Sequence, residues 1–139
     1  MIAGNVRDVR QALFAELTYH TAYDPMRAIR TERHAYIRSF ADRPLHLPVH
    51  VDASPTKDLL RDSGYFEARR PPEMLFDLVN DPWERSNLAS DPACASVRGE
   101  LQDRLERWLH ATGDPLLHGE VAAPTGAILT PFDAYAPEG

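Results

Sequence analysis

The sequence predicts an α+β fold, in which a small antiparallel sheet of about four strands carries a long C-terminal helix packed on one face. Short runs with strand character occupy the first part of the chain, and the clearest helical pattern comes last. The 139 residues are enough for one domain with a modest core. The 12 prolines, well above the usual ~5% of a globular chain, predict fixed turns and irregular stretches between the elements.

The predicted sheet begins with three short runs. Residues 13–19 place apolar or aromatic side chains at every second position, which is typical of a strand with one buried face. Asp24-Pro25 then predicts a turn. Two further runs, Met26 to Thr31 and His34 to Phe40, are separated only by Glu32-Arg33, and this spacing predicts a hairpin.

Residues 41–72 are rich in proline and are predicted to be mainly irregular. Within them, Ser54-Pro55 provides a helix N-cap and a first-turn proline, so a short helix is expected here, ending near Gly64. Met74 to Leu78 returns to strand character, and Asn80-Asp81-Pro82 ends it.

The last element is the clearest helix. Asp91-Pro92 predicts its start, and Gly113 predicts its end. Glu100 and Arg104 form an i,i+4 pair on the solvent side. Four apolar side chains share the opposite face: Val97, Leu101, Leu105 and Trp108. We therefore expect a lead-in over residues 1–11, one domain over 12–117 with the irregular insertion at 41–72, and an extended, partly disordered tail over 118–139.

Composition excludes several classes of function. The net charge of −6 offers no basic stripe for nucleic acid. No apolar run approaches the ~20 residues of a membrane span, and we expect no signal peptide in the first residues because they contain no long apolar stretch. The single cysteine excludes an internal disulfide framework and leaves the cellular compartment open.

Few residues suggest chemistry. His46 and His50 have a metal-like spacing, but Pro48 separates them and no clustered carboxylate or cysteine joins them, so we expect no metal site. Cys94 lies in the first turn of the long helix, where a thiol pKa is lowered, yet alanines flank it and no histidine is near in sequence. A structural thiol is the better interpretation.

The segment from Thr18 to Arg27 is the best candidate for a binding site, because it concentrates polar and aromatic side chains where a strand ends. His20 and Tyr23 are its most suggestive members, and the alternative is that they only close the edge of the sheet. Arg27 also begins an interrupted basic series with Arg30, Arg33 and Arg38, which either pairs with acidic groups or attracts an anion.

Several motifs together resemble the C-terminal domain of type I sulfatases, most closely the heparan N-sulfatase-like members. The "D-L-x-x-D-P-x-E-x-x-N-L-A" signature of that domain is matched by Asp77-Leu78, Asn80-Asp81-Pro82, Glu84 and Asn87-Leu88-Ala89. Residues 25–38 are similar to the strand pair before the signature. Trp108 and Thr112-Gly113-Asp114-Pro115 are similar to the closing "W…T-x-D-P". The resemblance covers residues 12–117.

The resemblance also implies what this chain lacks. Sulfatases convert the cysteine of C-x-P-S-R or C-x-A-S-R to formylglycine and hold calcium with Asp and Asn residues, all in a large N-terminal catalytic domain. The segment from Cys94 to Arg98 has the right length but other residues between, and it lies at the start of the terminal helix. We therefore expect Cys94 to stay unmodified. No catalytic residue, metal or cofactor is expected in this chain, with calcium and formylglycine in the catalytic domain.

The resulting expectation is a sulfatase-family C-terminal domain that supports the catalytic domain, helps to rim its substrate pocket and is inactive alone. His20, Tyr23 and Arg27 are the candidates for the rim, and a sulfated sugar is the expected ligand of the whole enzyme. The alternative is a freestanding module that binds anionic, sulfated sugars or a protein partner. Self-association through an uncovered docking face is a third hypothesis.

Overall fold

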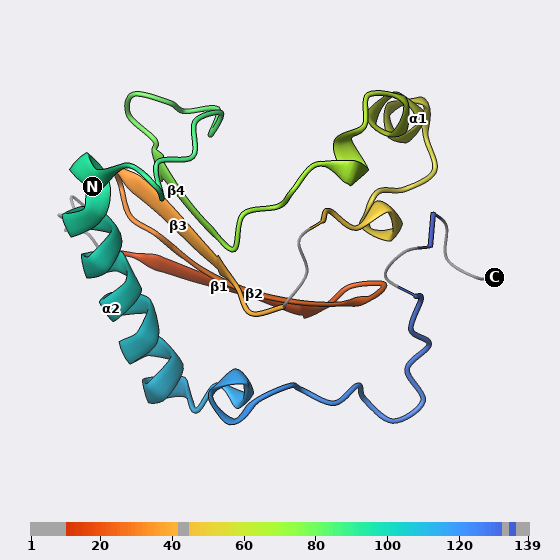
Figure 1. The fold of residues 1–139 in the computed structure, drawn as a ribbon. Coiled ribbons are helices and arrows are strands. Elements are labelled where there is room, and N and C mark those ends of the chain that lie inside the picture. The colour runs from red at the N-terminus through yellow and green to blue at the C-terminus, as the bar shows by residue number, and fades with distance from the viewer. Residues whose placement is uncertain (1–10, 42–44, 132–133, 136–139) are drawn as a thin grey trace, which may run out of the picture.

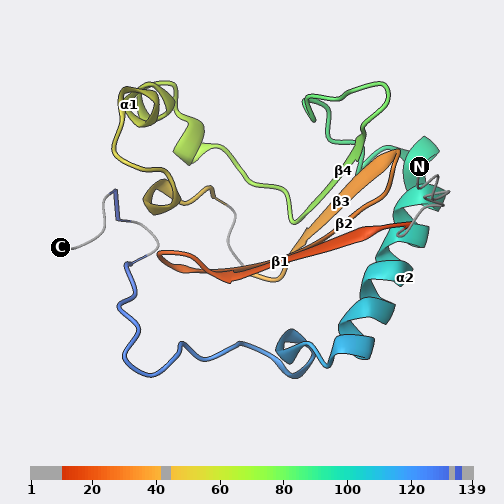
Figure 2. The same ribbon diagram turned by 180° about the vertical axis from the view of Figure 1, so that it is seen from behind.

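The computed structural model describes residues 11–41, 45–131 and 134–135, and it confirms the α+β class. A four-stranded antiparallel sheet in the order β1-β2-β3-β4 is accompanied by one long helix (Figure 1). The view from behind shows that α2 lies near one end of the sheet, while the β1–β2 hairpin points toward the other (Figure 2). The bounds are β1 Leu13–Tyr19, β2 Tyr23–Arg30, β3 His34–Ser39, α1 Pro55–Asp62, β4 Glu73–Asp77 and α2 Ala95–Thr112.

The predicted turn at Asp24-Pro25 is wrong, because both residues lie inside β2. The pairing of β1 with β2 shifts between Leu17 and Tyr19, so that Asp24-Pro25 lies opposite the single residue between them. Such a bulge tolerates proline, which has no N–H to donate to a strand partner. The Pro25 carbonyl still accepts a hydrogen bond from Phe40 N–H at 2.9 Å. The strand therefore continues through the proline, and the chain reverses at residues 20–22.

The two helices begin and end as their sequences predict. Ser54 Oγ accepts a hydrogen bond from Lys57 N–H at 3.2 Å, which caps α1. Gly64, with φ of +74°, follows the end of α1, and Gly113, with φ of +64°, ends α2. Both glycines adopt the left-handed conformation that terminates helices. Asp91 caps a short 3₁₀-helix, residues 92–94, that leads directly into α2.

The main core lies between α2 and one face of the sheet. Leu101 and Leu105 of α2 are buried together with residues from three strands. Phe14 of β1 stacks on Trp108 with ring centroids 5.0 Å apart, which extends the core along the helix. The strand residues buried in this core are Ile29, Tyr36 and Leu75, which the register places side by side across β2, β3 and β4.

The connection from β4 to α2 is held by side chains that bond to backbone. Asn87 Oδ1 accepts from Leu75 N–H at 2.9 Å and from Ala89 N–H at 3.0 Å. Asn87 Nδ2 donates to the Glu73 carbonyl at 3.0 Å. This amide therefore replaces a neighbouring strand along part of the outer edge of β4. Asp81 likewise accepts from Ser86 N–H at 2.8 Å, so the loop folds back on itself.

Asp77 closes the other end of this connection. Its carboxylate accepts from Val79 N–H at 3.1 Å and pairs with Arg33 at 2.9 Å. The pKa of Asp77 is lowered to about 2. The hydrogen bond from Arg33 is the largest cause, and those from Asn80 and Val79 add to it. The charged carboxylate is thus part of the folded turn.

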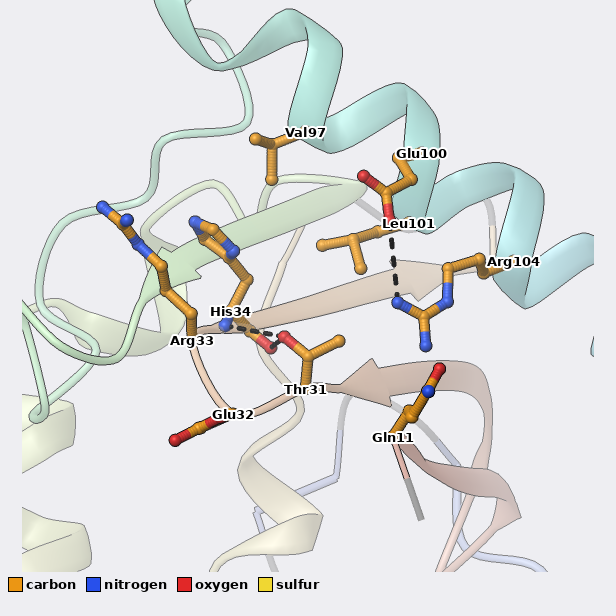
Figure 3. A pocket seen from close by; sticks show the side chains of 9 residues that line it. All are labelled: Gln11, Thr31, Glu32, Arg33, His34, Val97, Glu100, Leu101 and Arg104. Carbon is orange, nitrogen blue, oxygen red and sulfur yellow. Dashed lines mark hydrogen bonds and ion pairs between the residues drawn. The ribbon is translucent and has the colours of Figure 1, made fainter. Parts of the chain in front are cut away.

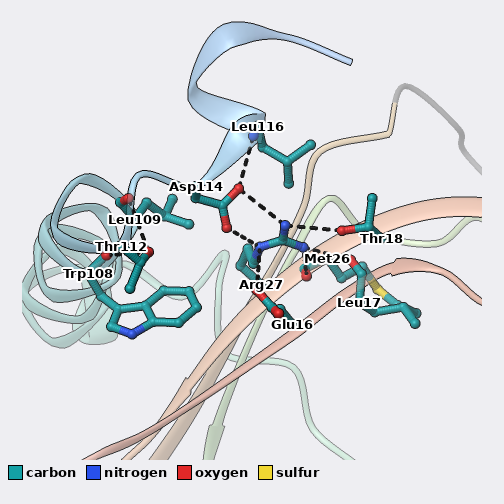
Figure 4. Close-up of polar contacts among 10 residues, drawn as sticks. All are labelled: Glu16, Leu17, Thr18, Met26, Arg27, Trp108, Leu109, Thr112, Asp114 and Leu116. Atoms are coloured by element: carbon teal, nitrogen blue, oxygen red, sulfur yellow. Dashed lines mark hydrogen bonds and ion pairs between the residues drawn. The ribbon is translucent and has the colours of Figure 1, made fainter. Parts of the chain in front are cut away.

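A buried ion pair joins the sheet to the end of α2 (Figure 4). Arg27 of β2 and Asp114, just beyond α2, are only 2% and 3% exposed. Arg27 Nε donates to Asp114 Oδ2 at 2.6 Å, and Nη2 donates to Oδ1 at 3.2 Å. The remaining donors reach the carbonyls of Leu17 and Met26 and the hydroxyl of Thr18, so all five guanidinium N–H groups are used.

Beyond α2 the chain runs back along the sheet toward the β1–β2 hairpin (Figures 1 and 2). Thr130 N–H donates to the Thr21 carbonyl at 2.9 Å, and the ring of Tyr135 lies edge-on to Phe66. Among the described residues, no helix combines the length and apolar character needed to cross a membrane.

Replacing the buried guanidinium tests its structural role. Arg27→Met keeps much of the side-chain volume but leaves Asp114 buried without its partner, so we expect a loss of about 3–5 kcal/mol in the free energy of unfolding, measured in urea. Arg30→Met is the matched control, because the Arg30–Glu84 pair is largely exposed and its loss is expected to cost less than about 1 kcal/mol. Equal losses for both variants would contradict the assignment.

The lowered carboxyl pKa values predict acid sensitivity. Burial would raise the pKa of Asp114, but hydrogen bonds from Arg27 and Leu116 N–H outweigh it, so this pKa also lies below its ordinary value. A carboxyl whose pKa is depressed by folding stabilises the fold above its unfolded pKa, and this contribution disappears as the pH falls through the folded pKa. Stability should therefore decline from about pH 4 toward pH 2.

Asp77→Asn isolates one of these contributions. We expect the variant to be less stable than the parent at neutral pH and to lose less stability than the parent on acidification. Urea midpoints measured across the acid range check this, and parallel pH profiles for both proteins would show that Asp77 is not involved.

Candidate functional site

The candidate segment forms the tip of the β1–β2 hairpin, at the end of the sheet away from α2 (Figures 1 and 2). The reversal is tight, because His20 N–H donates to the Ala22 carbonyl at 3.2 Å. Ala22 is buried and forms a small second core with Leu47 and Val49. The proline-rich insertion therefore packs against the hairpin tip.

His20 is exposed at this tip and contacts the insertion. Its ring lies edge-on to that of His50, with centroids 5.3 Å apart. Its Nδ1 lies 3.1 Å from Thr21 Oγ1, and Thr21 Oγ1 donates to the Val49 carbonyl at 3.1 Å. Two histidines that are 30 positions apart in the sequence thus meet at the hairpin tip. Only His20 is exposed there and could donate a hydrogen bond to an anionic group, because the His50 side chain is 18% exposed and its Nε2 is buried.

A second buried ion pair lies beneath the histidines. Arg70 binds Asp24 through both terminal nitrogens, at 2.7 and 2.8 Å, and also donates to Ser39 Oγ. Asp24 is 1% exposed, and Arg70 is 8% exposed. His50 Nδ1 lies 3.6 Å from Asp24 Oδ2. A bidentate arginine–carboxylate pair has a fixed geometry, so the histidines rest on a rigid base.

Tyr23 faces the C-terminal tail. Its hydroxyl accepts from Val121 N–H at 3.2 Å, while the Tyr19 hydroxyl donates to the Val121 carbonyl at 2.6 Å. The two phenol rings lie 4.9 Å apart. Burial, with the nearby Tyr23 and Glu120, raises the pKa of Tyr19. The tail is therefore bound to the hairpin tip through the backbone N–H and carbonyl of a single residue, Val121.

Two of the three predicted rim residues lie at the hairpin tip, but their side chains contact different segments. His20 is exposed and lies against His50 of the insertion, and Tyr23 is half-buried against Val121 of the tail. Arg27 lies inside the fold with its guanidinium on Asp114. Arg27 can influence a rim only by holding the backbone of Leu17 and Met26 in place. The prediction that these residues face a substrate remains a prediction.

The other residues considered for chemistry, His46 and Cys94, pack against neighbouring side chains. His46 stacks on Tyr65 with centroids 4.5 Å apart, and burial together with the charge of Arg70 lowers its pKa. Cys94 is half-buried and packs against the main core. Within the described part of the chain, no group of three or more His, Cys, Asp or Glu residues is placed to hold a metal ion.

The basic series is mostly paired with acids, as one of the two interpretations predicted. Arg30 binds Glu84 at 2.9 Å and Arg33 binds Asp77 at 2.9 Å. Arg38 instead lies over the ring of Phe40, 4.8 Å from its centroid. These arginines point to different neighbours and do not form one anion-binding face.

An open groove of about 300 Å³ lies at the opposite end of the sheet, between the β2–β3 turn and α2 (Figure 3). Its charged side chains carry both signs, and two of them, Glu100 and Arg104, are paired at 3.7 Å. None of the predicted rim residues lines it. Its lining consists of Gln11, Thr31, Glu32, Arg33, His34, Val97, Glu100, Leu101 and Arg104.

The sequence did not indicate Arg70, His50 or Val121 as parts of the hairpin tip. Arg70 follows an irregular stretch without any motif, and Val121 contributes only backbone atoms. The one available signal was the pair Tyr19 and Tyr23, which a hairpin reversal places on neighbouring strands.

Comparison with known proteins gives consistent matches. An ulvan-active sulfatase from Formosa agariphila is 33% identical over 108 residues, which cover 77% of this chain and 21% of that relative. The human N-sulphoglucosamine sulphohydrolase is 30% identical over 137 residues, covering 84% of this chain and 25% of that relative. The solved structure of a 2-O GAG sulfatase superposes with a TM-score of 0.55 at 20% identity, covering 94% of this chain and 22% of that chain. No family model matches the chain.

The chain thus spans about a fifth to a quarter of the length of the curated relatives that it matches. The ulvan-active sulfatase matches at least as well as the N-sulphoglucosamine enzyme, so the similarity does not single out the heparan N-sulfatase branch. Since sulfatases of different kinds match this same chain in sequence, and a sulfatase structure shares its fold, the chain is a C-terminal domain of the sulfatase family.

Proposed function

We propose that this domain supports the catalytic domain of a larger sulfatase and places the β1–β2 hairpin tip at the edge of its substrate pocket. The observation that carries the proposal is the exposed His20 on a rigid base, with His50 against its ring and the Asp24–Arg70 pair below. Such a surface suits an anionic sugar, because the exposed imidazole of His20 can donate a hydrogen bond to a sulfate oxygen and the base limits the entropy lost on binding.

Within this proposal the chain contributes binding and support but no chemistry. Formylglycine and calcium would belong to the catalytic domain. The half-buried Cys94 packs on the core here, and the residues between it and Arg98 depart from the C-x-P-S-R pattern. Sulfate ester or N-sulfate hydrolysis is proposed only for the whole enzyme.

The purified chain is therefore expected to release no sulfate from an aryl sulfate, measured by the absorbance of the phenolate product. Mass spectrometry should find Cys94 unmodified after expression with a formylglycine-generating enzyme. Turnover by the chain alone, or conversion of Cys94, would contradict this part of the proposal.

Binding separates the proposed function from the freestanding-module alternative. A rim that contributes only part of a pocket should bind a sulfated disaccharide too weakly for calorimetry at millimolar ligand. If the chain alone does bind, and His20→Ala removes binding while His118→Ala at another exposed histidine does not, the freestanding module is favoured. Binding that survives His20→Ala would exclude the hairpin tip as the site.

A further inference from the structure

The face of the sheet opposite α2 is apolar, and no helix of the described residues packs on its centre. Residues that pair directly across antiparallel strands point to the same face, so the register defines this surface. All of its members except Arg30 and Ser39 are apolar. They are Leu13, Ala15 and Leu17 of β1, Met26, Ala28 and Arg30 of β2, Ala35, Ile37 and Ser39 of β3, and Met74 and Phe76 of β4.

Antiparallel sheets with one solvated face ordinarily alternate apolar and polar side chains along each strand. This sheet does not, since both of its faces are apolar at the centre. On the α2 side Ile29, Tyr36 and Leu75 are fully buried, whereas their counterparts Ala28 and Ile37 on the opposite side remain partly exposed. A contiguous apolar surface of this kind marks an interaction site.

Two irregular segments flank this surface and leave its middle uncovered. The insertion lies above one end of the sheet, and the β4–α2 connection lies above the other (Figure 1). The Arg30–Glu84 ion pair anchors the connection over this face, where Ala35 and Phe76 are buried. The partly exposed middle consists of Leu17, Met26, Ala28, Ile37 and Met74, and we call it the open face.

The connection presents two large apolar side chains to solvent. Trp83 is 79% exposed and Val79 is 66% exposed. The loop is nevertheless well fixed by Asp81 and Asn87, and Glu84 holds a left-handed backbone with φ of +52°. Non-glycine residues in that conformation cost energy and persist where the surroundings enforce them. A rigid loop with an exposed tryptophan is typical of an interface anchor.

We propose that the catalytic domain covers the open face and that Trp83 is an anchor of this contact. The inference rests on the proposed function, and it adds which surface docks. The comparisons indicate the occupant. In these relatives the chain outside the part matched by this domain is three to four times as long as the matched part. A face that is flanked on two sides would receive a convex, apolar surface of that larger part. The hairpin tip borders the same sheet, so docking here leaves His20 at the edge of the joint.

The two methionines of the open face provide the test. The chain has three methionines, and Met26 and Met74 both lie on this face. The probe is a full-length chimera in which this chain replaces the matching 108 residues of the Formosa agariphila sulfatase. Peroxide oxidation of each methionine is followed by mass spectrometry in the chimera and in the isolated chain. Leu59→Met on α1, at a position 68% exposed, serves as the control site in both proteins.

We expect Met26 and Met74 to oxidise several-fold more slowly in the chimera, while the control methionine at position 59 reacts equally in both. One cooperative thermal transition with unprotected Met26 and Met74 would mean that the domains dock through another surface, which overturns this inference and leaves the proposed function standing. Two independent transitions with unprotected methionines would overturn both. Protection already present in a dimer of the isolated chain would identify a second copy as the occupant and also overturn the inference.

A pair of substitutions tests the anchor separately. Trp83→Ser should leave the melting temperature of the isolated chain unchanged, because the side chain is mostly exposed there, and should lower that of the chimera. Leu59→Ser replaces another largely exposed apolar residue, on α1 and not on the β4–α2 connection, and should change neither melting temperature. A chimera that is indifferent to Trp83→Ser would remove Trp83 from the interface.

Discussion

The Arg27–Asp114 ion pair is the interaction on which the arrangement of this domain depends. It joins the middle of the sheet to the point where α2 ends, and it is shielded from water on both sides. Each of the five guanidinium donors has an acceptor, which offsets the large cost of burying the charge. Three of those acceptors belong to β1 and β2, so the same side chain fixes the hairpin, the end of the helix and the start of the tail.

This pair also shows that the residues of the family motifs in this chain stabilise the fold. Arg27 lies in the segment that resembles the sulfatase strand pair, and Asp114 lies in the closing motif. In the signature between them, Asp77, Asp81 and Asn87 bond to backbone N–H groups. Polar residues at such positions determine the path of irregular chain, because buried backbone groups need partners wherever no strand or helix supplies them. The motif is thus specific for a fold.

Local patterns are sufficient for most elements and insufficient for three features. The bounds of β1, both helix caps and the apolar stripe of α2 depend on neighbours in sequence, and the structure has them where the patterns place them. The predicted buried face of β1 is wrong, because Leu13 and Ala15 are exposed while Phe14 packs on the core. The local sequence predicts a turn at Pro25, but this proline lies at a bulge inside β2. A bulge depends on the pairing with the opposite strand, which the local sequence does not show. Arg27 is expected at the rim, in a basic series that either pairs with acids or attracts an anion. Its burial depends on an acid 87 positions away in the sequence.

The contacts of the tail with the sheet depend on backbone groups of the tail and can be kept when its side chains change. At the hairpin tip it is held through the N–H and carbonyl of Val121, and farther along through the N–H of Thr130. Every residue except proline offers these groups, so substitutions in the tail can accumulate without altering its course. Selection would then act on the tyrosines that receive the tail and on the number of residues between Asp114 and Thr130. Related domains could share this course with no recognisable similarity in their tails.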